Sequence, residues 1–308
     1  MESAGAVCES PNVLRTLRDW ACSLVFVVVF ALTMLGFDVA LRIASLFGIR
    51  AESRVAGWAQ RCLLEILRIC DIRLEVERSP LVREGVSYVF VANHQSMFDM
   101  PIYGSVFASN VPKYISKVEL SRWIPTVSFH LRSGGHAIID RKDRDSAVKA
   151  IEKLGQEIER NGFSAMIFPE GTRARKGEIK PFKPAGTVAL LSRTNVPVVP
   201  VCVDESWRLL EKSLLPLPFG VRLKVWVGDP IERRPGDDPY EIVSECERRI
   251  RDALGRMRGE ALPPPAPLQR TAEDAERWLG TGPAVGVNGN GTGGDASRDR
   301  GTQPTLGA

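Results

Sequence analysis

The sequence predicts an α/β fold: a central mixed sheet flanked by helices, with N-terminal membrane-associated helices and a disordered C-terminal tail. Short β-rich segments alternate with stretches of helical periodicity through the middle of the chain, which is the pattern of an α/β domain. A long apolar run precedes this region and a Pro/Gly-rich stretch follows it. These three observations divide the chain into a leader (1–20), a membrane-associated helical segment (21–70), an α/β domain (71–258) and a disordered tail (259–308).

The composition is that of an ordinary globular protein. Of the 308 residues, 44% are hydrophobic and 25% are charged, which excludes a chain disordered throughout and one built mainly of membrane helices. The net charge of +4 is too small for the broad basic surface of a nucleic-acid binder, although it suits an anionic lipid surface. The six cysteines are scattered without paired spacing, which indicates reduced thiols and no cysteine-based zinc site.

The apolar run near the N-terminus predicts a membrane-associated helix. From Ala21 to Phe37 no residue is charged, and a spanning helix needs about 17 to 25 apolar residues. Asp38 and Arg42 lie four residues apart, where an ion pair lowers the cost of burying the following turns. The run fits a spanning helix and a helix lying in one leaflet equally well, with a buried core helix as the other alternative. A signal peptide fits poorly because acidic residues dilute the leader and no clear cleavage site follows.

The next segment, Arg54 to Cys70, predicts an amphipathic helix. Its apolar residues recur at helical spacing opposite arginines and a glutamate. Beside a hydrophobic neighbour, such a helix lies at the lipid interface with Trp58 at headgroup level, or packs onto the domain. The sequence does not choose between these two positions.

Seven β-rich segments predict the strands of the central sheet. The clearest helices between and after them are Ser146–Arg160, with one apolar stripe, and Pro239–Met257. A short helix is also expected after Pro184. Because proline cannot donate a ladder hydrogen bond, Pro197 and Pro200 predict that their strand forms an edge or a cleft wall. The predicted strands are Ile72–Val76, Tyr88–Ala92, Lys113–Ser116, Ala137–Ile139, Ala165–Phe168, Val198–Val203 and Leu223–Val227.

One of these strands delivers a histidine to a place where clefts form. The strand Tyr88–Ala92 ends in Asn93 and His94, and Asp99 follows five residues later. A turn brings such a carboxylate back to the imidazole, where it fixes the tautomer and leaves the other nitrogen free to accept a proton from a hydroxyl. The alternative is that Asp99 caps the next helix. His130 and His136 lack a comparable acidic neighbour in the sequence and are expected to be structural.

A second strand, Ala165–Phe168, runs into a polar turn with the sequence PEGTR. Glu170, Gly171, Thr172 and Arg173 leave the strand where backbone N–H groups and a guanidinium can face an anion. Arginine suits phosphate because its planar fork binds two oxygens at once. Arg141, after a glycine turn and a short strand, supplies a second guanidinium. The alternative is a surface loop with solvated charges.

Four segments, in this order and spacing, resemble the motifs of the glycerophospholipid acyltransferase family, most closely those of the lysophosphatidate acyltransferases. The resemblance covers roughly Val76 to Val227 and is specific because the four motifs occur together. One departure is Ala174, where the family often has serine, which puts a hydroxyl contact in doubt. The segments are Asn93-His94 with Asp99, Gly134 to Arg141, Phe168 to Arg173, and Val196 to Val201.

The resemblance implies an O-acyltransferase that moves a fatty acyl group from acyl-CoA or acyl-carrier protein to the free hydroxyl of lysophosphatidate, giving phosphatidate. Alternatives are glycerol 3-phosphate or another lysolipid as acceptor, a thioester or lipid hydrolase, and a non-catalytic membrane adaptor. We expect no cofactor, no metal site and no nucleic-acid partner, and a membrane location with the catalytic domain at 71–258 facing the cytoplasm. The expected catalytic residues are His94 and Asp99, and the expected substrate-binding residues are Asn93, Arg141, Glu170, Gly171, Thr172 and Arg173.

Overall fold

A computed structural model describes residues 13–122, 124–140, 142–174, 176–211 and 215–268. Most of the expected leader and nearly all of the expected tail lie outside these residues. The centre of the fold is a sheet of seven strands: β1 (Arg73–Arg78), β2 (Val89–Ala92), β3 (Pro112–Lys117), β4 (Ala137–Ile139), β5 (Ser164–Ile167), β6 (Val198–Asp204) and β7 (Arg222–Val227).

The strands are arranged in the order β1-β7-β6-β2-β5-β3-β4. Every neighbouring pair is parallel except β6 and β7, so the sheet is mixed, as predicted. All seven predicted strands are present, with ends displaced by one or two residues. The strand that carries Pro200 is not an edge strand, which excludes the first of the two positions expected from the sequence, an edge or a cleft wall. Its antiparallel ladder with β7 covers only 201–204, so Pro200 lies where β7 has already ended and no donor is needed.

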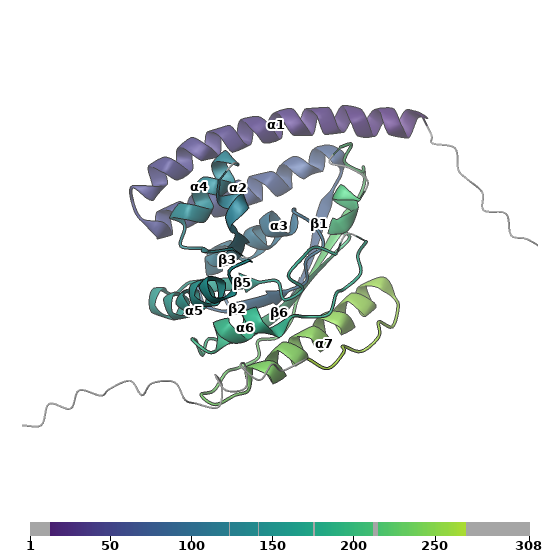
Figure 1. Cartoon of the computed structure of the whole chain (residues 1–308). Coiled ribbons are helices and arrows are strands. Elements are labelled where there is room, and N and C mark those ends of the chain that lie inside the picture. Colours follow the sequence, from purple (N-terminus) through teal and green to yellow (C-terminus); the bar gives the residue numbers. More distant parts are fainter. Residues whose placement is uncertain (1–12, 123, 141, 175, 212–214, 269–308) are drawn as a thin grey trace, which may run out of the picture. The chain divides into compact units, whose positions relative to one another are not determined.

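Helices cover both faces of the sheet (Figure 1). Side chains alternate along the central strands: Phe90 and Ala92 join the core beneath α1, α2 and α3, whereas Val89 and Val91 join the core beneath α5, α6 and α7. Because both faces are buried there, the central strands β2 and β5 are almost wholly apolar. The helices are α1 (Val13–Ser45), α2 (Ile49–Leu67), α3 (Asp99–Val106), α4 (Pro125–Ser133), α5 (Arg144–Asn161), α6 (Pro184–Leu191) and α7 (Pro239–Arg258), with 3₁₀ turns η1 (Arg68–Cys70), η2 (Ala108–Asn110), η3 (Val118–Ser121) and η4 (Ser206–Leu210).

Helix α1 contains the apolar run. It is 33 residues long and, among the described residues, is the one helix long and apolar enough to cross a membrane by length and composition. Only 11% of its most apolar window is buried within the protein. Asp38 and Arg42 form the expected ion pair, with Arg42 Nε 2.8 Å from Asp38 Oδ2. The predicted amphipathic helix is present as α2 and packs against α1 and α3.

A buried polar cluster joins α2 to the α/β domain near the amino end of β3. His130 on α4 donates from Nδ1 to Glu52 Oε1 on α2 (2.7 Å), and the Nε2 atoms of His130 and His136 lie 3.1 Å apart. Glu52 is fully buried and its Oε2 has no partner in the described part of the chain. Lys113, equally buried, donates to Ser53 Oγ at 2.7 Å, and burial lowers its pKa to about 8.

The hydrogen bonds of this cluster fix the tautomers of both histidines. His136 Nδ1 accepts from the backbone N–H of Tyr114 (2.9 Å), so the His136 proton is on Nε2 and is donated to His130. His130 then carries its own proton on Nδ1, which it donates to Glu52. Protonating either ring would set two N–H groups against each other. Burial accordingly lowers the pKa of His136 well below 6.5, so the hydrogen bonds of this ring are those of its neutral form.

Replacing His130 with alanine is expected to lower the free energy of unfolding by about 3 kcal/mol, because it leaves the buried carboxylate of Glu52 without a donor from the ring. Thermal unfolding of the detergent-solubilised chain measures the loss. Glu65→Ala is the matched control on the same helix, since Glu65 pairs with Arg68 and both side chains are 62% exposed. Equal stability of the His130 and Glu65 variants would contradict the assignment.

Candidate functional site

The candidate site forms where two parallel strands end side by side. β2 and β5 are neighbours in register, with Val89 opposite Ala165 and Val91 opposite Ile167. His94 follows β2 and Glu170 follows β5. Both residues therefore lie at the carboxyl ends of these two neighbouring strands. Ligand sites in α/β folds lie at the carboxyl ends of strands. The sheet thus brings the first and third sequence segments together.

His94 and Asp99 form a hydrogen-bonded pair. His94 Nδ1 lies 2.8 Å from Asp99 Oδ2, and the side chains are 19% and 0% exposed respectively. The carboxylate accepts, so Nδ1 carries the proton and Nε2 is left as an acceptor. No hydrogen bond to Nε2 comes from any residue that the structure describes. His94 therefore presents one basic nitrogen at a partly open surface while its other nitrogen is held from behind.

Asp99 does not cap the following helix. It is the first residue of α3, and its Oδ2 accepts from residues that precede it: the backbone N–H groups of Gln95 (2.6 Å) and Ser96 (2.8 Å). These bonds fold the turn that returns the carboxylate to His94. Its other oxygen, Oδ1, accepts from the hydroxyl of Ser206 at 2.5 Å. Four donors thus satisfy the two oxygens of the buried carboxylate.

Glu170 braces the two loops against each other. Its Oε1 accepts from the backbone N–H of His94 (2.8 Å) and its Oε2 from that of Lys180 (3.2 Å). Burial raises the pKa of Glu170 to about 7, against the lowering effect of these two N–H donors. In return, the N–H of Ala174 donates to the carbonyl of His94 at 2.7 Å. Glu170 is 1% exposed, and its observed role is to hold the two loops together.

The rest of the 168–173 segment begins with a residue that contacts the His94 ring. The ring of Phe168 stacks on the imidazole, with centroids 4.4 Å apart. Gly171 has φ +70°, a left-handed conformation that glycine adopts without strain. Thr172 is exposed and Arg173 is half-buried. The segment that carries Gly171, Thr172 and Arg173 is thus held against the backbone of His94 at Glu170 and Ala174, while Arg141 lies outside the described residues.

Asn93 joins two neighbouring strands of the sheet. Its side chain is 1% exposed, and its amide bonds to both backbone groups of Val203: Nδ2 donates to the carbonyl (2.9 Å) and Oδ1 accepts from the N–H (2.8 Å). It also accepts from the hydroxyl of Tyr103 at 3.2 Å. Asn93 therefore ties the end of β2 to β6, and the predicted contact of its side chain with a substrate stays a prediction.

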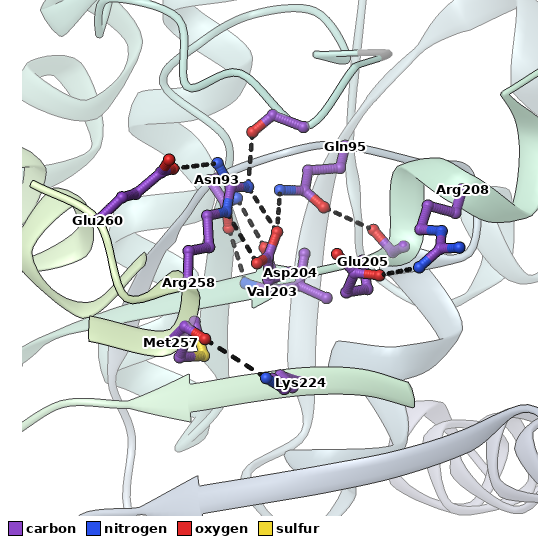
Figure 2. A network of polar contacts seen from close by, with 12 residues as sticks. Asn93, Gln95, Val203, Asp204, Glu205, Arg208, Lys224, Met257, Arg258 and Glu260 are labelled. Atoms are coloured by element: carbon purple, nitrogen blue, oxygen red, sulfur yellow. Dashed lines mark hydrogen bonds and ion pairs between the residues drawn. The ribbon is translucent and has the colours of Figure 1, made fainter. Parts of the chain in front are cut away.

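Several residues of this site carry no sequence motif. Gln95 donates from Nε2 to Asp204 Oδ1 (3.3 Å), and Arg258 at the end of α7 grips both oxygens of Asp204 at 2.5 and 2.8 Å (Figure 2). Ser206 donates the remaining hydrogen bond to the Asp99 carboxylate. Gln95 directly follows His94, whereas Asp204, Ser206 and Arg258 come from the end of β6, η4 and α7, far from His94 in the sequence. Within the described residues, no group of three or more His, Cys, Asp or Glu side chains is placed to hold a metal ion.

Comparison with known proteins identifies relatives of this chain. The family model described as Acyltransferase matches residues 73–204. A human protein named 1-acyl-sn-glycerol-3-phosphate acyltransferase beta is 33% identical over 198 residues, covering 64% of this chain and 69% of the relative. A Saccharomyces cerevisiae protein named 1-acyl-sn-glycerol-3-phosphate acyltransferase is 27% identical over 191 residues, covering 59% of this chain. The alignment spans 60% of the yeast protein, less than two thirds of its length.

A solved structure has the same fold. The crystal structure of the 1-acyl-sn-glycerophosphate (LPA) acyltransferase PlsC from Thermotoga maritima aligns with a TM-score of 0.62 and 22% sequence identity, covering 81% of this chain and 100% of that one. The family match contains His94, Asp99 and the 168–173 segment, so it coincides with the site built above. The chain belongs to the acyltransferase family that includes the 1-acyl-sn-glycerol-3-phosphate acyltransferases.

Proposed function

We propose that this chain transfers a fatty acyl group from an acyl thioester, acyl-CoA or acyl-carrier protein, to the free hydroxyl of lysophosphatidate, giving phosphatidate. The observation that carries the proposal is the His94–Asp99 pair, 2.8 Å apart, at the carboxyl end of β2. The names of the human and yeast relatives support lysophosphatidate as the acceptor. The site needs no serine or cysteine nucleophile, because a base beside an acceptor hydroxyl is sufficient for direct transfer.

In the proposed reaction, His94 Nε2 takes the proton of the acceptor hydroxyl as its oxygen attacks the thioester carbonyl. The tetrahedral intermediate then collapses with cleavage of the C–S bond, and the imidazolium returns the proton to the departing thiolate. The products are the new ester and a free thiol, so atoms and charges balance. Asp99 holds Nδ1–H throughout and stabilises the imidazolium that forms.

The 170–173 loop is proposed to hold the phosphate of the acceptor. Arg173 is half-buried and carries the paired N–H groups that suit phosphate, and Thr172 is exposed beside it. Glu170 fixes the loop to the backbone of His94 at 2.8 Å. Because that bond sets the distance between loop and base, a phosphate bound by the loop places the neighbouring hydroxyl against Nε2.

Helix α1 is proposed to lie in one leaflet of the membrane, with the catalytic domain facing the cytoplasm. Along α1, Ser23 accepts from the N–H of Leu217 (2.8 Å), the carbonyl of Met34 accepts from Thr126 (2.8 Å), and Leu41 is 1% exposed. At 1.5 Å per residue these contacts span about 27 Å, nearly the thickness of a hydrocarbon core. A spanning α1 would carry the flank of the domain into the bilayer. The opposite face of α1 is exposed and apolar: Leu17, Leu24, Val28, Leu32, Leu35, Val39 and Ile43.

The test of the proposed reaction supplies the purified chain with labelled acyl-CoA, or acyl-carrier protein, and offers lysophosphatidate, glycerol 3-phosphate and other lysolipids side by side. Mass analysis of the product should show phosphatidate as the main acylated lipid. A different acylated product would change the acceptor. Release of free fatty acid alone would establish a hydrolase, and no turnover with any pair would favour the non-catalytic adaptor.

Replacing His94 with alanine is expected to lower turnover about a thousandfold while the chain stays folded, since the proton of the acceptor loses its base. Initial rates, with thermal unfolding as the check on folding, measure both effects. Lys153→Ala, at a 75% exposed position on α5, is the control and should keep full activity. Wild-type turnover by the purified His94 variant would refute the base assignment.

Replacing Arg173 with alanine is expected to raise KM for lysophosphatidate about tenfold, because a charge-assisted contact to phosphate is lost. The KM of Arg173→Lys should lie between those of the wild type and the alanine variant, because lysine keeps the charge without the paired N–H groups. A monoacylglycerol acceptor, which has no phosphate, serves as the internal control. If its rate fell as much as that of lysophosphatidate, the phosphate role of Arg173 would be wrong.

The membrane placement predicts that both ends of α1 lie on one side of the bilayer. Val13→Cys and Leu46→Cys, at positions that are 68% and 82% exposed, mark the two ends. In sealed vesicles with the cytoplasmic face outward, a membrane-impermeant maleimide should add one label to each variant relative to the parent chain. Labelling of only one of the two sites would show that α1 spans the membrane.

A further inference from the structure

Asp99 has two carboxylate oxygens with unequal support. Oδ2 receives three donors, namely Nδ1–H of His94 and the backbone N–H groups of Gln95 and Ser96. Oδ1 receives one among the described residues, the hydroxyl of Ser206 at 2.5 Å. The torsion that rotates a carboxylate is soft, so three bonds on a single oxygen do not fix the plane of the group. The hydrogen bond from Ser206 to Oδ1 fixes that plane.

The chain turns sharply to bring Ser206 to this position. β6 ends at Asp204, and Glu205 has φ 69°, a left-handed conformation that side chains other than glycine rarely adopt. Ser206 then begins η4 with an exposed area of 0%. An unfavourable backbone conformation persists where the surrounding structure requires it. Here it places a buried hydroxyl against the carboxylate that orients the base.

A second layer keeps this arrangement in place. The hydroxyl of Ser206 also lies 3.4 Å from Gln95 Oε1, and the amide of Gln95 donates to Asp204. Arg258 pairs with Asp204 and donates to the carbonyl of Gly177 at 2.7 Å, so the last turn of α7 holds both the end of β6 and the loop that follows Arg173 (Figure 2). The positive charge of the guanidinium also balances the negative charge of Asp204, which is linked to Asp99 through Gln95 and Ser206.

We propose that Ser206 is a positioning residue for the acyl transfer: its hydroxyl fixes the plane of the Asp99 carboxylate and thereby aims Nε2 of His94 at the acceptor hydroxyl. This inference rests on the proposed function. Ser206 lies just outside the residues matched by the family model and outside all four sequence segments. It is fully buried and touches no substrate, so its effect is on the chemical step and not on binding.

The test compares Ser206→Ala with the wild-type chain in full-length, purified form. We expect kcat to fall about tenfold while KM for lysophosphatidate stays within about twofold, because a misaligned base slows transfer without changing the phosphate contact. Ser206→Thr keeps the hydroxyl and should restore most of the turnover. Unchanged kcat in the alanine variant, or a loss explained by a rise in KM, would overturn the proposal.

Ser164→Ala is the matched control for simple loss of a buried serine. Ser164 is also 0% exposed, and its hydroxyl accepts from the backbone N–H of Tyr88 at 3.1 Å, at the opposite end of β5 from the site. Its replacement should lower the unfolding temperature and leave kcat unchanged. If Ser164→Ala reduced kcat as much as Ser206→Ala, the effect at Ser206 would be general destabilisation and the positioning role would fall.

A spectroscopic measurement separates alignment from folding. The chain has three histidines, so ¹⁵N labelling of histidine gives three imidazoles to follow. Ser206→Ala should change the Nδ1–H signal of His94 and leave His130 and His136 as they are, and unchanged His94 signals would contradict the proposal. If the alanine variant does not fold, Ser206→Cys replaces the hydroxyl with a weaker donor of similar shape. It should then turn over more slowly than wild type, and equal turnover would refute the role.

The same experiments keep the two proposals apart. If the wild-type chain does not acylate lysophosphatidate, the proposed function fails, and if His94→Ala acylates it as fast as the wild type, the base assignment fails. If the wild type is active, His94→Ala is inactive and Ser206→Ala equals the wild type, the function stands and only the role of Ser206 is rejected.

Discussion

The parallel pairing of β2 with β5 and β6 is the constraint on which the rest of the site depends. Ala92 lies opposite Val201 on one side, and Val91 lies opposite Ile167 on the other. The loops that follow β2, β5 and β6 therefore begin side by side at the carboxyl ends of these strands. A register shift of one residue would turn every side chain to the other face, which two buried cores forbid. The geometry of the base is thus secured by packing that involves no catalytic residue.

Within that frame the site consists of polar groups that hold one another. A buried carboxylate is costly unless its oxygens are fully supplied with donors, and Asp99 is supplied by the turn it closes and by Ser206. Asn93 does the same for the end of β2 and Glu170 for the end of β5. Two residues that the sequence motifs suggest as substrate contacts, Asn93 and Glu170, are in this structure parts of the scaffold.

Much of this arrangement could be predicted from the sequence because it is local or periodic. The seven strands follow from apolar runs, and the His94–Asp99 pair follows from a strand end and a five-residue turn. What could not be predicted depends on distance along the chain. Ser206 lies 107 residues from Asp99, and Glu52 lies 78 residues from His130, so no spacing rule links them. The expectation of an edge strand at Pro200 failed because the rule assumes a full ladder, and β7 ends before it reaches the proline.

The buried carboxylates at the two ends of the parallel strands differ in how many hydrogen bonds they receive. At the carboxyl ends, Asp99 has donors on both oxygens. Near the amino end of β3, Glu52 has His130 and Ser133 on Oε1, at 2.7 and 3.2 Å, and no partner on Oε2 among the described residues. A carboxylate left half supplied contributes less to stability than its burial costs. The attachment of α2 therefore rests more on apolar packing, in which Leu63 and Leu67 join the core beneath α1, α2 and α3. The catalytic pair is instead fixed by hydrogen bonds from three loops.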